Sequence, residues 1–256
     1  MNNFDAEVIS NTEVAKDIFN LKFMCADLAA AARPGQFVEV LCEGAGAPFL
    51  RRPFGVYRAG AGGDCEILFK RVGKGTDILS GLTKGQKINV TGPLGNGFTI
   101  EKGKTHLIAG GGMGVAPLMF LAETIFNAGE KPQIFLAAKT AEQIAGIELF
   151  KKFGEVIIST EDGSLGEKCL IDTPLERTLK TAKNAVIYSC GPHGMLRCVA
   201  DLGAKYNTPV QVSLEEKMAC GLGVCQGCPV KLKNKDTKYK MVCKDGPVFD
   251  GGDVVW

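Results

Sequence analysis

Four cysteines near the C-terminus have the spacing of metal ligands. They are Cys220, Cys225, Cys228 and Cys243. Three fall within nine residues and the fourth follows after fourteen more, which is the order and spacing of the thiolates that hold a plant-type [2Fe–2S] cluster. Glycines between them allow sharp backbone turns that bring the sulfurs and several amides together. The pattern predicts a [2Fe–2S] cluster bound by these four cysteines.

A structural zinc site is the alternative for the same residues. Zinc sites usually pair two short Cys-x2-Cys hooks, whereas three of these ligands share one loop, and this favours iron. The other six of the ten cysteines are scattered singly along the chain. We expect them to be reduced and to behave as small buried apolar residues, not as disulfides.

Two glycine-bearing segments in the second half of the chain could hold a nucleotide. The first contains Gly110, Gly111, Gly112 and Gly114, and the second is Cys190-Gly191-Pro192. Each follows a strand pattern and opens a helix pattern, where main-chain amides and the helix N-terminus can approach a pyrophosphate. A tight turn needs glycine even without a ligand, so one segment alone is weak evidence. Both should lie on the carboxyl edge of one sheet, where open α/β folds bind ligands.

Two basic segments in the first half could hold phosphate. Arg51-Arg52-Pro53-Phe54-Gly55 places paired cations beside an aromatic ring, and residues 73–77 offer flexible amides, a lysine and a hydroxyl. Such groups bind phosphate through charge-assisted hydrogen bonds. Taken singly, each is more often a solvated basic turn than a binding site. Their combination in one half of the chain makes them candidates for a site.

Two patterns of apolar residues predict the strands and helices that must position these groups. Short alternating runs separated by Gly- and Pro-bearing turns predict a small antiparallel barrel in the first 100 residues or so. These runs are 18–23, 37–41, 66–72 and 87–90. Beyond residue 103, apolar runs alternate with amphipathic stretches, which predicts a parallel sheet with helices on its faces. The runs are 105–109, 133–138, 156–160 and 185–189, and the helices are 116–128, 141–153 and 169–180.

We therefore expect a multidomain α+β protein. The predicted units are a β-barrel over 1–101, an α/β domain over 102–212 and a small cluster domain over 213–256. The last unit is rich in Cys, Gly and Lys, so a bound inorganic centre would supply much of its stability. The terminal residue, Trp256, is expected to fray.

Charge and hydropathy exclude some classes of function. The 256 residues carry 30 Lys plus Arg against 28 Asp plus Glu, so nothing suggests a nucleic acid or an anionic membrane as partner. No stretch approaches the ~18 apolar residues of a membrane span, and the opening MNNFDAEVIS lacks the pattern of an export signal. We expect a cytoplasmic protein that binds small molecules and other proteins.

The order of the motifs resembles the ferredoxin–NADP reductase superfamily and, within it, the electron-transfer subunits of type B dihydroorotate dehydrogenase. The superfamily resemblance rests on Arg52-Pro53-Phe54-Gly55, Gly73-x-Gly75-Thr76, Gly92-Pro93-Leu94-Gly95-Asn96-Gly97-Phe98 and the two glycine-bearing segments. The narrower one rests on Ser213-Leu214-Glu215-Glu216, the cysteine loop and Val242-Cys243-Lys244-Asp245-Gly246-Pro247-Val248-Phe249. The resemblance covers essentially the whole chain.

This resemblance implies a six-stranded FAD-binding barrel and an NAD-binding α/β domain. The residues implied for FAD are Arg52, Pro53, Phe54, Gly55, Phe69, Lys70, Arg71, Gly75 and Thr76. Those implied for NAD(H) are Gly110, Gly111, Gly112, Gly114, Cys190, Gly191 and Pro192. The family usually has Ser or Thr where Gly55 stands, with a hydroxyl that can reach flavin N5, so another group must replace it here. Residues 160–164 are expected near the adenosine, with no contact assigned.

The function implied is electron transfer in pyrimidine biosynthesis. Electrons would leave the FMN of a dihydroorotate dehydrogenase catalytic subunit, pass singly through the [2Fe–2S] cluster to FAD, and reduce NAD+. The resemblance implies a two-plus-two heterotetramer, and no residue of this chain needs to act as a general acid or base.

Two other functions fit the same motifs. One is the FAD and [2Fe–2S] subunit of another NAD(P)H-linked complex, of hydrogenase, sulfite reductase or ferredoxin–NADP oxidoreductase type. The other, from a different class, is a zinc-stabilised nucleotide-binding regulator. The sequence also leaves NAD and NADP open, since Lys139 follows the second strand of the α/β domain and could contact a 2′-phosphate.

Overall fold

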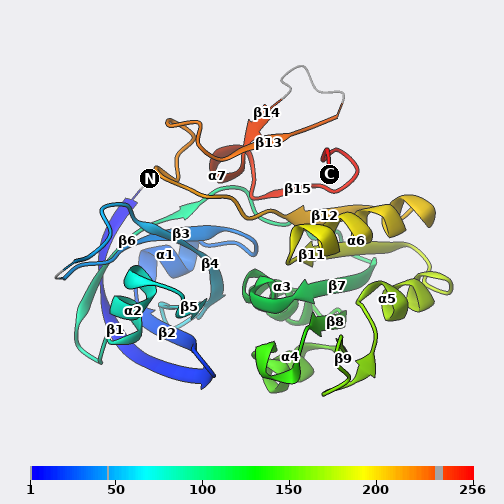
Figure 1. Ribbon diagram of the computed structural model, residues 1–256, viewed down its shortest axis with the longest axis horizontal. Helices are drawn as coiled ribbons and strands as arrows, with labels where there is room; N and C mark the ends of the chain where they lie inside the picture. The colour runs from blue at the N-terminus through cyan, green and yellow to red at the C-terminus, as the bar shows by residue number, and fades with distance from the viewer. Residues whose placement is uncertain (1, 45, 234–238) are drawn as a thin grey trace.

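The computed structural model describes residues 2–44, 46–233 and 239–256. Figure 1 shows two large units side by side, a barrel at the left and an α/β unit at the right, with the C-terminal segment lying across the top. Residues from all three parts line one cavity at their junction. The fold therefore brings the candidate groups of the sequence toward a common place.

The N-terminal unit is a closed antiparallel barrel, which in the described residues has the six strands that the resemblance implied. They are β1 (Asn2–Ala15), β2 (Ile18–Met24), β3 (Phe37–Leu41), β4 (Arg52–Ala59), β5 (Asp64–Lys70) and β6 (Lys87–Leu94), with α1 (Ala26–Ala31) and α2 (Lys74–Ser80) in the connections. Side chains alternate along a strand. In β3, Val38 and Val40 pack in the barrel core, whereas Phe37 packs in the cluster that contains Cys228 and Cys243. Residues of β3 therefore belong to two different hydrophobic clusters, one inside the barrel and one beside the cysteines.

The second unit is built on a mostly parallel sheet. Within the described ranges its order is β10-β9-β8-β7-β11-β12-β15, and the edge strand β15 pairs antiparallel with β12. The strands are β7 (Thr105–Gly111), β8 (Gln133–Ala138), β9 (Glu155–Thr160), β10 (Glu167–Lys168), β11 (Ala185–Cys190), β12 (Val210–Ser213) and β15 (Val248–Asp250). The α3 (Val115–Asn127) and α4 (Ile147–Phe153) helices cover one face, and α5 (Asp172–Leu179) and α6 (His193–Lys205) cover the other. The predicted strand and helix alternation is confirmed.

The helix predicted over 141–153 is interrupted, so its continuity was wrong. The structure has a 3-10 turn, η2 (Ala141–Gln143), and α4 begins only at Ile147. Between them Gly146 adopts a φ of +78°, a left-handed conformation that ends a right-handed helical path. A Cβ at Gly146 would lie 2.8 Å from the Tyr57 hydroxyl. The break lets the start of α4 approach the barrel, a contact that sequence periodicity does not report.

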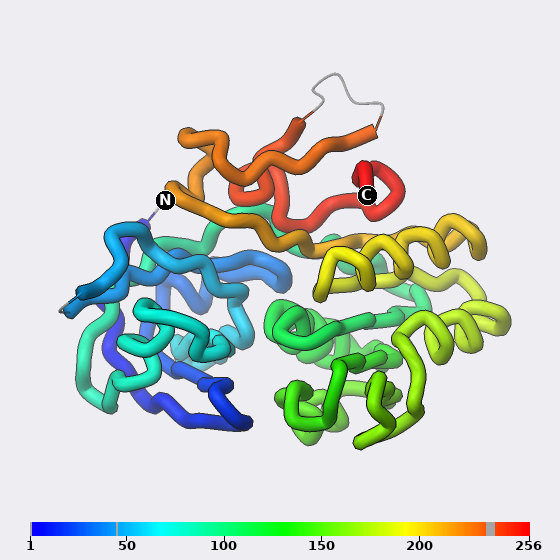
Figure 2. Tube along the Cα trace, viewed as in Figure 1, coloured from blue at the N-terminus to red at the C-terminus, as the bar shows by residue number. Residues whose placement is uncertain are grey.

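The C-terminal segment leaves the sheet after β12 and returns to it. In Figure 2 the orange trace passes toward the barrel side before turning back, and the red trace ends over the sheet. The segment holds β13 (Pro229–Lys231), β14 (Tyr239–Met241), the short helix α7 (Val242–Asp245) and β15. Trp256 is held, contrary to the expectation of fraying. Its indole N–H donates to the Gly251 carbonyl at 3.0 Å, and its ring meets His193 edge-on at 5.1 Å.

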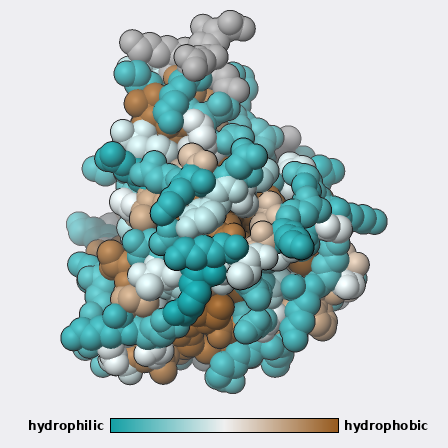
Figure 3. Space-filling view, turned by 90° about the vertical axis from the view of Figure 1, so that its right-hand side faces the viewer, coloured by the Kyte–Doolittle hydropathy of each residue, from teal (hydrophilic) through white to brown (hydrophobic). Residues whose placement is uncertain are grey.

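The outer surface of the α/β unit is largely polar. Figure 3 shows this side with hydrophilic side chains framing an apolar area in its lower half. Single exposed apolar side chains such as Phe126 and Leu170 are normal on a globular protein. In the described part of the chain, no helix is long and apolar enough to cross a membrane.

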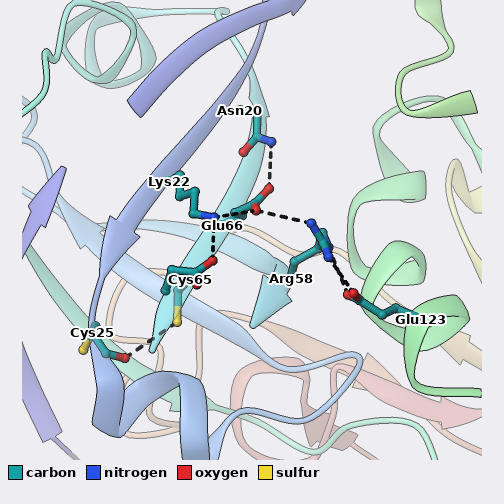
Figure 4. Close-up of polar contacts among 8 residues, drawn as sticks. Asn20, Lys22, Cys25, Arg58, Cys65, Glu66 and Glu123 are labelled. Carbon is teal, nitrogen blue, oxygen red and sulfur yellow. Dashed lines mark hydrogen bonds and ion pairs between the residues drawn. The ribbon is translucent and has the colours of Figure 1, made fainter. Parts of the chain in front are cut away.

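An ion-pair network joins the barrel to the α/β unit (Figure 4). Arg58 of β4 makes a two-pronged contact with Glu123 of α3, at 2.9 Å from Nε and 2.5 Å from Nη2. Its Nη1 lies 3.6 Å from Glu66 of β5, which also accepts a hydrogen bond from Asn20 at 2.8 Å. The carboxyl of Glu66 is only 8 % exposed. Without Arg58 its one remaining cation among the described residues is Lys22, whose ammonium lies 3.7 Å away, so its buried charge is less well compensated. The network holds α3, and the loop that precedes it, against the barrel.

Replacing Arg58 with methionine tests this coupling. We expect R58M to lower the free energy of unfolding by about 1–3 kcal/mol, because two partly buried carboxylates lose their shared cation, as measured by urea denaturation. The matched control is R177M, whose guanidinium pairs with Glu167 but is 61 % exposed, so that change should cost less than about 1 kcal/mol. Equal losses in the two variants would contradict a special role for Arg58.

Candidate functional site

The four cysteine sulfurs lie in two pairs. The sulfurs of Cys228 and Cys243 are 3.3 Å apart, and the thiol of Cys225 is hydrogen-bonded to that of Cys220. All ten cysteines are free thiols. Among the described residues, no three His, Cys, Asp or Glu side chains converge on a single ion. Two pairs suit a binuclear cluster, in which each iron takes two protein ligands, better than a mononuclear zinc site.

Backbone amides of the loop point at the sulfurs. The N–H groups of Leu222 and Cys225 donate to the sulfur of Cys220 at 3.4 and 3.5 Å, and the Gly223 N–H donates to Cys243 at 3.0 Å. Although burial acts to raise it, the N–H groups of Cys225 and Leu222 help to lower the pKa of Cys220 to about 6, and the thiolate is the form that ligates metal. Amide hydrogen bonds to sulfur also tune the potential of a bound cluster. The loop therefore fits a [2Fe–2S] group.

Close contacts fix the loop against the barrel. Gly221 has a φ of +65°, and a Cβ there would lie 2.7 Å from Oε1 of Glu39 in β3. The segment that carries the fourth ligand, Cys243, is held by Asn96. Its side-chain amide donates to the carbonyls of Lys244 and Asp245 at 3.1 and 3.0 Å. Any side chain at Gly221 would push the cysteine loop away from β3.

Glu39 is a candidate residue of the cluster site that could not be identified from the sequence. It is 2 % exposed, and neither carboxyl oxygen has a hydrogen-bond partner in the described residues. Burial raises the pKa of Glu39 to about 7, against the opposing effect of Arg51. The available signal was a single charged residue inside the apolar run 37–41, but only the tertiary structure shows that it faces the cysteine loop.

A cavity of about 470 Å³ gathers most of the residues predicted for FAD. From the barrel side it is lined by Arg52, Pro53, Phe54, Gly55, Phe69, Lys70 and Thr76. From the α/β side it is lined by Met113, Ala116, Pro117 and Cys190, and from the C-terminal segment by residues 213–216, Met218 and Pro247. Apolar walls with two cations suit a flat aromatic ring system that carries phosphates.

Two of the residues predicted for FAD lie outside this lining. Arg71 turns to Asp17, with Nη2 at 2.6 Å from its carboxylate. Gly75 sits behind Arg52, because a Cβ at Gly75 would lie 3.4 Å from the Arg52 side chain. The role of Arg71 stays a prediction, and Gly75 acts here by letting the arginine lie close to α2.

The hydroxyl of Thr76 is used within its own turn. It accepts the N–H groups of Val72 and Gly73 at 2.8 and 3.1 Å and donates to the Gly73 carbonyl at 2.9 Å. Such a capping arrangement fixes the start of α2. The turn is thereby rigid before any phosphate binds, and main-chain amides are the groups that it can offer.

Glycine at position 55, where the family usually has Ser or Thr, also has a steric consequence. A Cβ at Gly55 would lie 3.3 Å from the Cβ of Pro117, in the first turn of α3. Glycine therefore allows the α/β unit to approach the barrel closely at the mouth of the cavity. Across the cavity, Ser213 carries a buried hydroxyl that is hydrogen-bonded to the Cys190 thiol.

The two glycine-bearing loops meet at the carboxyl edge of the sheet. A Cβ at Gly114 would come within 2.4 Å of the Cys190 carbonyl oxygen, so only glycine fits where the loops touch. Gly111 and Gly112 line a cavity of about 310 Å³ on the sheet edge, together with Pro192. Gly111, Gly112, Gly114, Gly191 and Pro192 also line a second cavity of about 470 Å³, toward the C-terminal segment. Gly110 lies below this surface and packs on Val115 and Leu118.

Comparison with known proteins places this architecture in a class and then in a family. The model of the iron-sulfur cluster binding domain of dihydroorotate dehydrogenase B matches residues 215–255. A solved NADH-dependent reduced ferredoxin-NADP oxidoreductase is similar with a TM-score of 0.88 and 30% identity, over 98% of this chain and 90% of that one. A ferredoxin reductase of carbazole 1,9a-dioxygenase, at 20% identity and a TM-score of 0.69, covers 82% of this chain and 68% of its own and shares the fold. The protein is thus a reductase-type oxidoreductase with an iron–sulfur domain.

Curated relatives narrow the class. Dihydroorotate dehydrogenase B (NAD(+)) electron transfer subunits from Desulforamulus reducens and Caldanaerobacter subterraneus subsp. tengcongensis are each 38% identical over 257 residues. The alignments cover 99% and 98% of this chain, and 98% of each relative. The chain belongs to this family of electron transfer subunits. Family and fold together give the cofactor set predicted from the sequence, which is FAD, a [2Fe–2S] cluster and NAD(H).

Gly114→Ala tests the contact between the two loops. We expect a loss of about 1–3 kcal/mol in unfolding free energy, because the new methyl meets the main chain of residues 190–191 and not a flexible side chain. The control is Gly194→Ala in the neighbouring helix α6, where a Cβ meets nothing within 4 Å, so that change should stay within about 0.5 kcal/mol. Thermal and urea denaturation measure both, and a tolerated G114A would contradict the contact.

Proposed function

We propose that this chain carries electrons between the FMN of a dihydroorotate dehydrogenase catalytic subunit and NAD+, as the electron-transfer subunit of an NAD-linked enzyme of pyrimidine biosynthesis. The observation that carries the proposal is a continuous segment. Residues 213–216 and Met218 line the cavity assigned to FAD, and Cys220, the first cluster ligand, follows two residues later. Cluster and flavin would then be close neighbours in space.

In this proposal Cys220 and Cys225 hold one iron, and Cys228 and Cys243 hold the other. The pairing is supported by the two sulfur pairs and by the amides aimed at them. The ligand pairs differ in access, since Cys228 and Cys243 are buried whereas Cys225 is exposed. Next to Cys225, Val224 is 79 % exposed. The exposed side of the loop is the face that we assign to the catalytic partner.

The barrel residues would bind FAD. Bound FAD supplies the exchange between a two-electron hydride and single electrons, a chemistry that belongs to the cofactor. Arg52 and Lys70 bring positive charge to the cavity, while Phe54 and Phe69 form an apolar wall with ring centroids 5.6 Å apart. The α2 turn offers its amides to phosphate. In the α/β unit, Gly111 and Gly112 let the NAD(H) pyrophosphate approach the main chain.

The assembly that we propose is a two-plus-two heterotetramer in which dihydroorotate is oxidised by the partner. None of the cavity residues of this chain is assigned as a general acid or base. We place the activity in the cytoplasm, because none of the cysteines in the described residues forms a disulfide and thiols stay reduced there.

A second candidate is favoured by one observation. The solved NADH-dependent reduced ferredoxin-NADP oxidoreductase matches this chain almost from end to end, so a subunit of that type is the alternative. Higher identity to the dihydroorotate dehydrogenase B relatives supports the first function. Mixing the purified chain with an FMN-containing catalytic subunit separates the two. Gain of dihydroorotate-dependent NAD+ reduction supports the first, and no gain, with ferredoxin serving instead, supports the second.

Cys225→Ser tests the cluster assignment. We expect the variant to lose the visible absorbance of the cluster and roughly two irons per chain, while it keeps its flavin and NADH-dependent reduction of that flavin. Dihydroorotate-dependent NAD+ reduction with the partner should then be lost. The control is Cys25→Ser, at a buried barrel cysteine outside the loop, which should keep iron, flavin and activity. Retention of full iron content in C225S would remove that residue from the ligand set.

A further inference from the structure

A cavity at the sheet edge carries two opposite charges beside the first glycine-bearing loop. It has a volume of about 310 Å³, and its lining includes Gly111, Gly112, Lys139, Glu161, Ile171 and Met195. Lys139 follows β8 and Glu161 follows β9, so both stand at the carboxyl ends of adjacent parallel strands. Nucleotides bind at such ends in open α/β sheets. The remaining lining is largely apolar, which suits an adenine ring.

The main chain holds Glu161 close to the end of β8. The Glu161 N–H donates to the Ala138 carbonyl at 3.1 Å, and the next N–H, of Asp162, donates to the Lys139 carbonyl at 3.2 Å. The carboxylate of Glu161 makes no hydrogen bond or ion pair with any described residue, and the same holds for the Lys139 ammonium. Both groups are exposed to an incoming ligand.

The other two carboxylates nearby are already engaged. Asp162 accepts the N–H and the hydroxyl of Ser164 at 2.9 and 2.7 Å. Asp172, which also lines the cavity, accepts the Thr173 N–H at 2.8 Å and the Cys198 thiol at 3.8 Å. Of the two acidic side chains that line this cavity, Glu161 is therefore the one with its oxygens available.

The chemistry of the two nicotinamide nucleotides differs at one position. NAD carries a hydroxyl at the 2′ carbon of the adenosine ribose, whereas NADP carries a phosphate there. A carboxylate accepts a hydrogen bond from the hydroxyl and repels the phosphate, while a lysine attracts the phosphate. In many dinucleotide folds the acidic residue follows the second strand, about 20 residues beyond the glycine loop. Here Lys139 follows that strand, and the adjacent strand supplies the carboxylate.

We propose that Glu161 selects NAD over NADP by accepting a hydrogen bond from the adenosine 2′-hydroxyl and repelling a 2′-phosphate. The assignment rests on the proposed function of this edge as the NAD(H) site. It answers the question, left open by the sequence because of Lys139, of whether the chain prefers NAD or NADP. The backbone fixes Glu161 at this corner, whereas the lysine ammonium is on a flexible four-carbon stem and can move into solvent.

Binding of adenosine fragments tests the proposal without electron transfer. Calorimetry with ADP and with 2′,5′-ADP measures the affinity of each fragment for the flavin- and cluster-loaded chain. The wild type should bind ADP more tightly. In Glu161→Gln we expect ADP binding to weaken about tenfold, since a charged acceptor is lost, and 2′,5′-ADP binding to strengthen by about as much. Lys139→Met should weaken 2′,5′-ADP only.

Glu148→Gln is the matched control. Glu148 is an exposed glutamate on α4 that pairs with Lys151, so the variant has the same change of net charge away from the cavity and should leave both affinities unchanged. Glu161→Asp, which keeps the charge, should keep the preference for ADP even if a shorter side chain weakens binding. An ADP to 2′,5′-ADP ratio that is the same in E161Q and wild type overturns the proposal.

The outcomes also separate this proposal from the function on which it rests. A wild type that binds ADP, with an E161Q variant that binds both fragments as the wild type does, sinks the role of Glu161 alone. A wild type that binds neither fragment removes the nucleotide site and both proposals with it. Absence of dihydroorotate-dependent NAD+ reduction, with ADP selectivity intact and Glu161-dependent, sinks the partner assignment and leaves the specificity residue in place.

Discussion

The cavities of this molecule depend on the contact between two strand-to-helix loops at the carboxyl edge of the sheet. Gly114 meets the main chain of Cys190 so tightly that no side chain fits between them. That contact sets where α3 begins, and through Pro117 it sets how near the helix lies to Gly55 of the barrel. Three residues at these contacts, Cys190, Pro117 and Gly55, also line the cavity assigned to FAD. Its shape therefore follows from a backbone-to-backbone distance.

The orientation of the two units depends on polar contacts as well as on this packing. Arg58 links Glu66 of the barrel with Glu123 of α3, and Asn96 links the end of the barrel with the segment after Cys243. Together they hold the cavity assigned to FAD, the cysteine loop and the carboxyl edge of the sheet at fixed positions relative to one another. Electron transfer between bound cofactors requires such fixed positions.

Much of the site could be predicted from the sequence because its signals are local. The spacing of Cys220 to Cys243 and the strand, glycine and helix order around Gly111 are readable within short windows. What could not be predicted depends on distant contacts. Glu39 becomes notable only against Gly221, the break at Gly146 reflects the nearby Tyr57 hydroxyl, and Arg71 turns to Asp17 and not to the cavity. Most residues predicted for FAD thus line one cavity, with Arg71 and Gly75 outside its lining.

The return of β15 to the sheet has a consequence for biosynthesis. The edge of β12 stays unpaired until residues 248–250 have been synthesised and can pair with it, and these residues follow all four cysteines in the chain. An uncovered strand edge invites association with other chains. Because β15 follows the four cysteines in the chain, this edge of the sheet is covered only after the metal-binding residues have been synthesised.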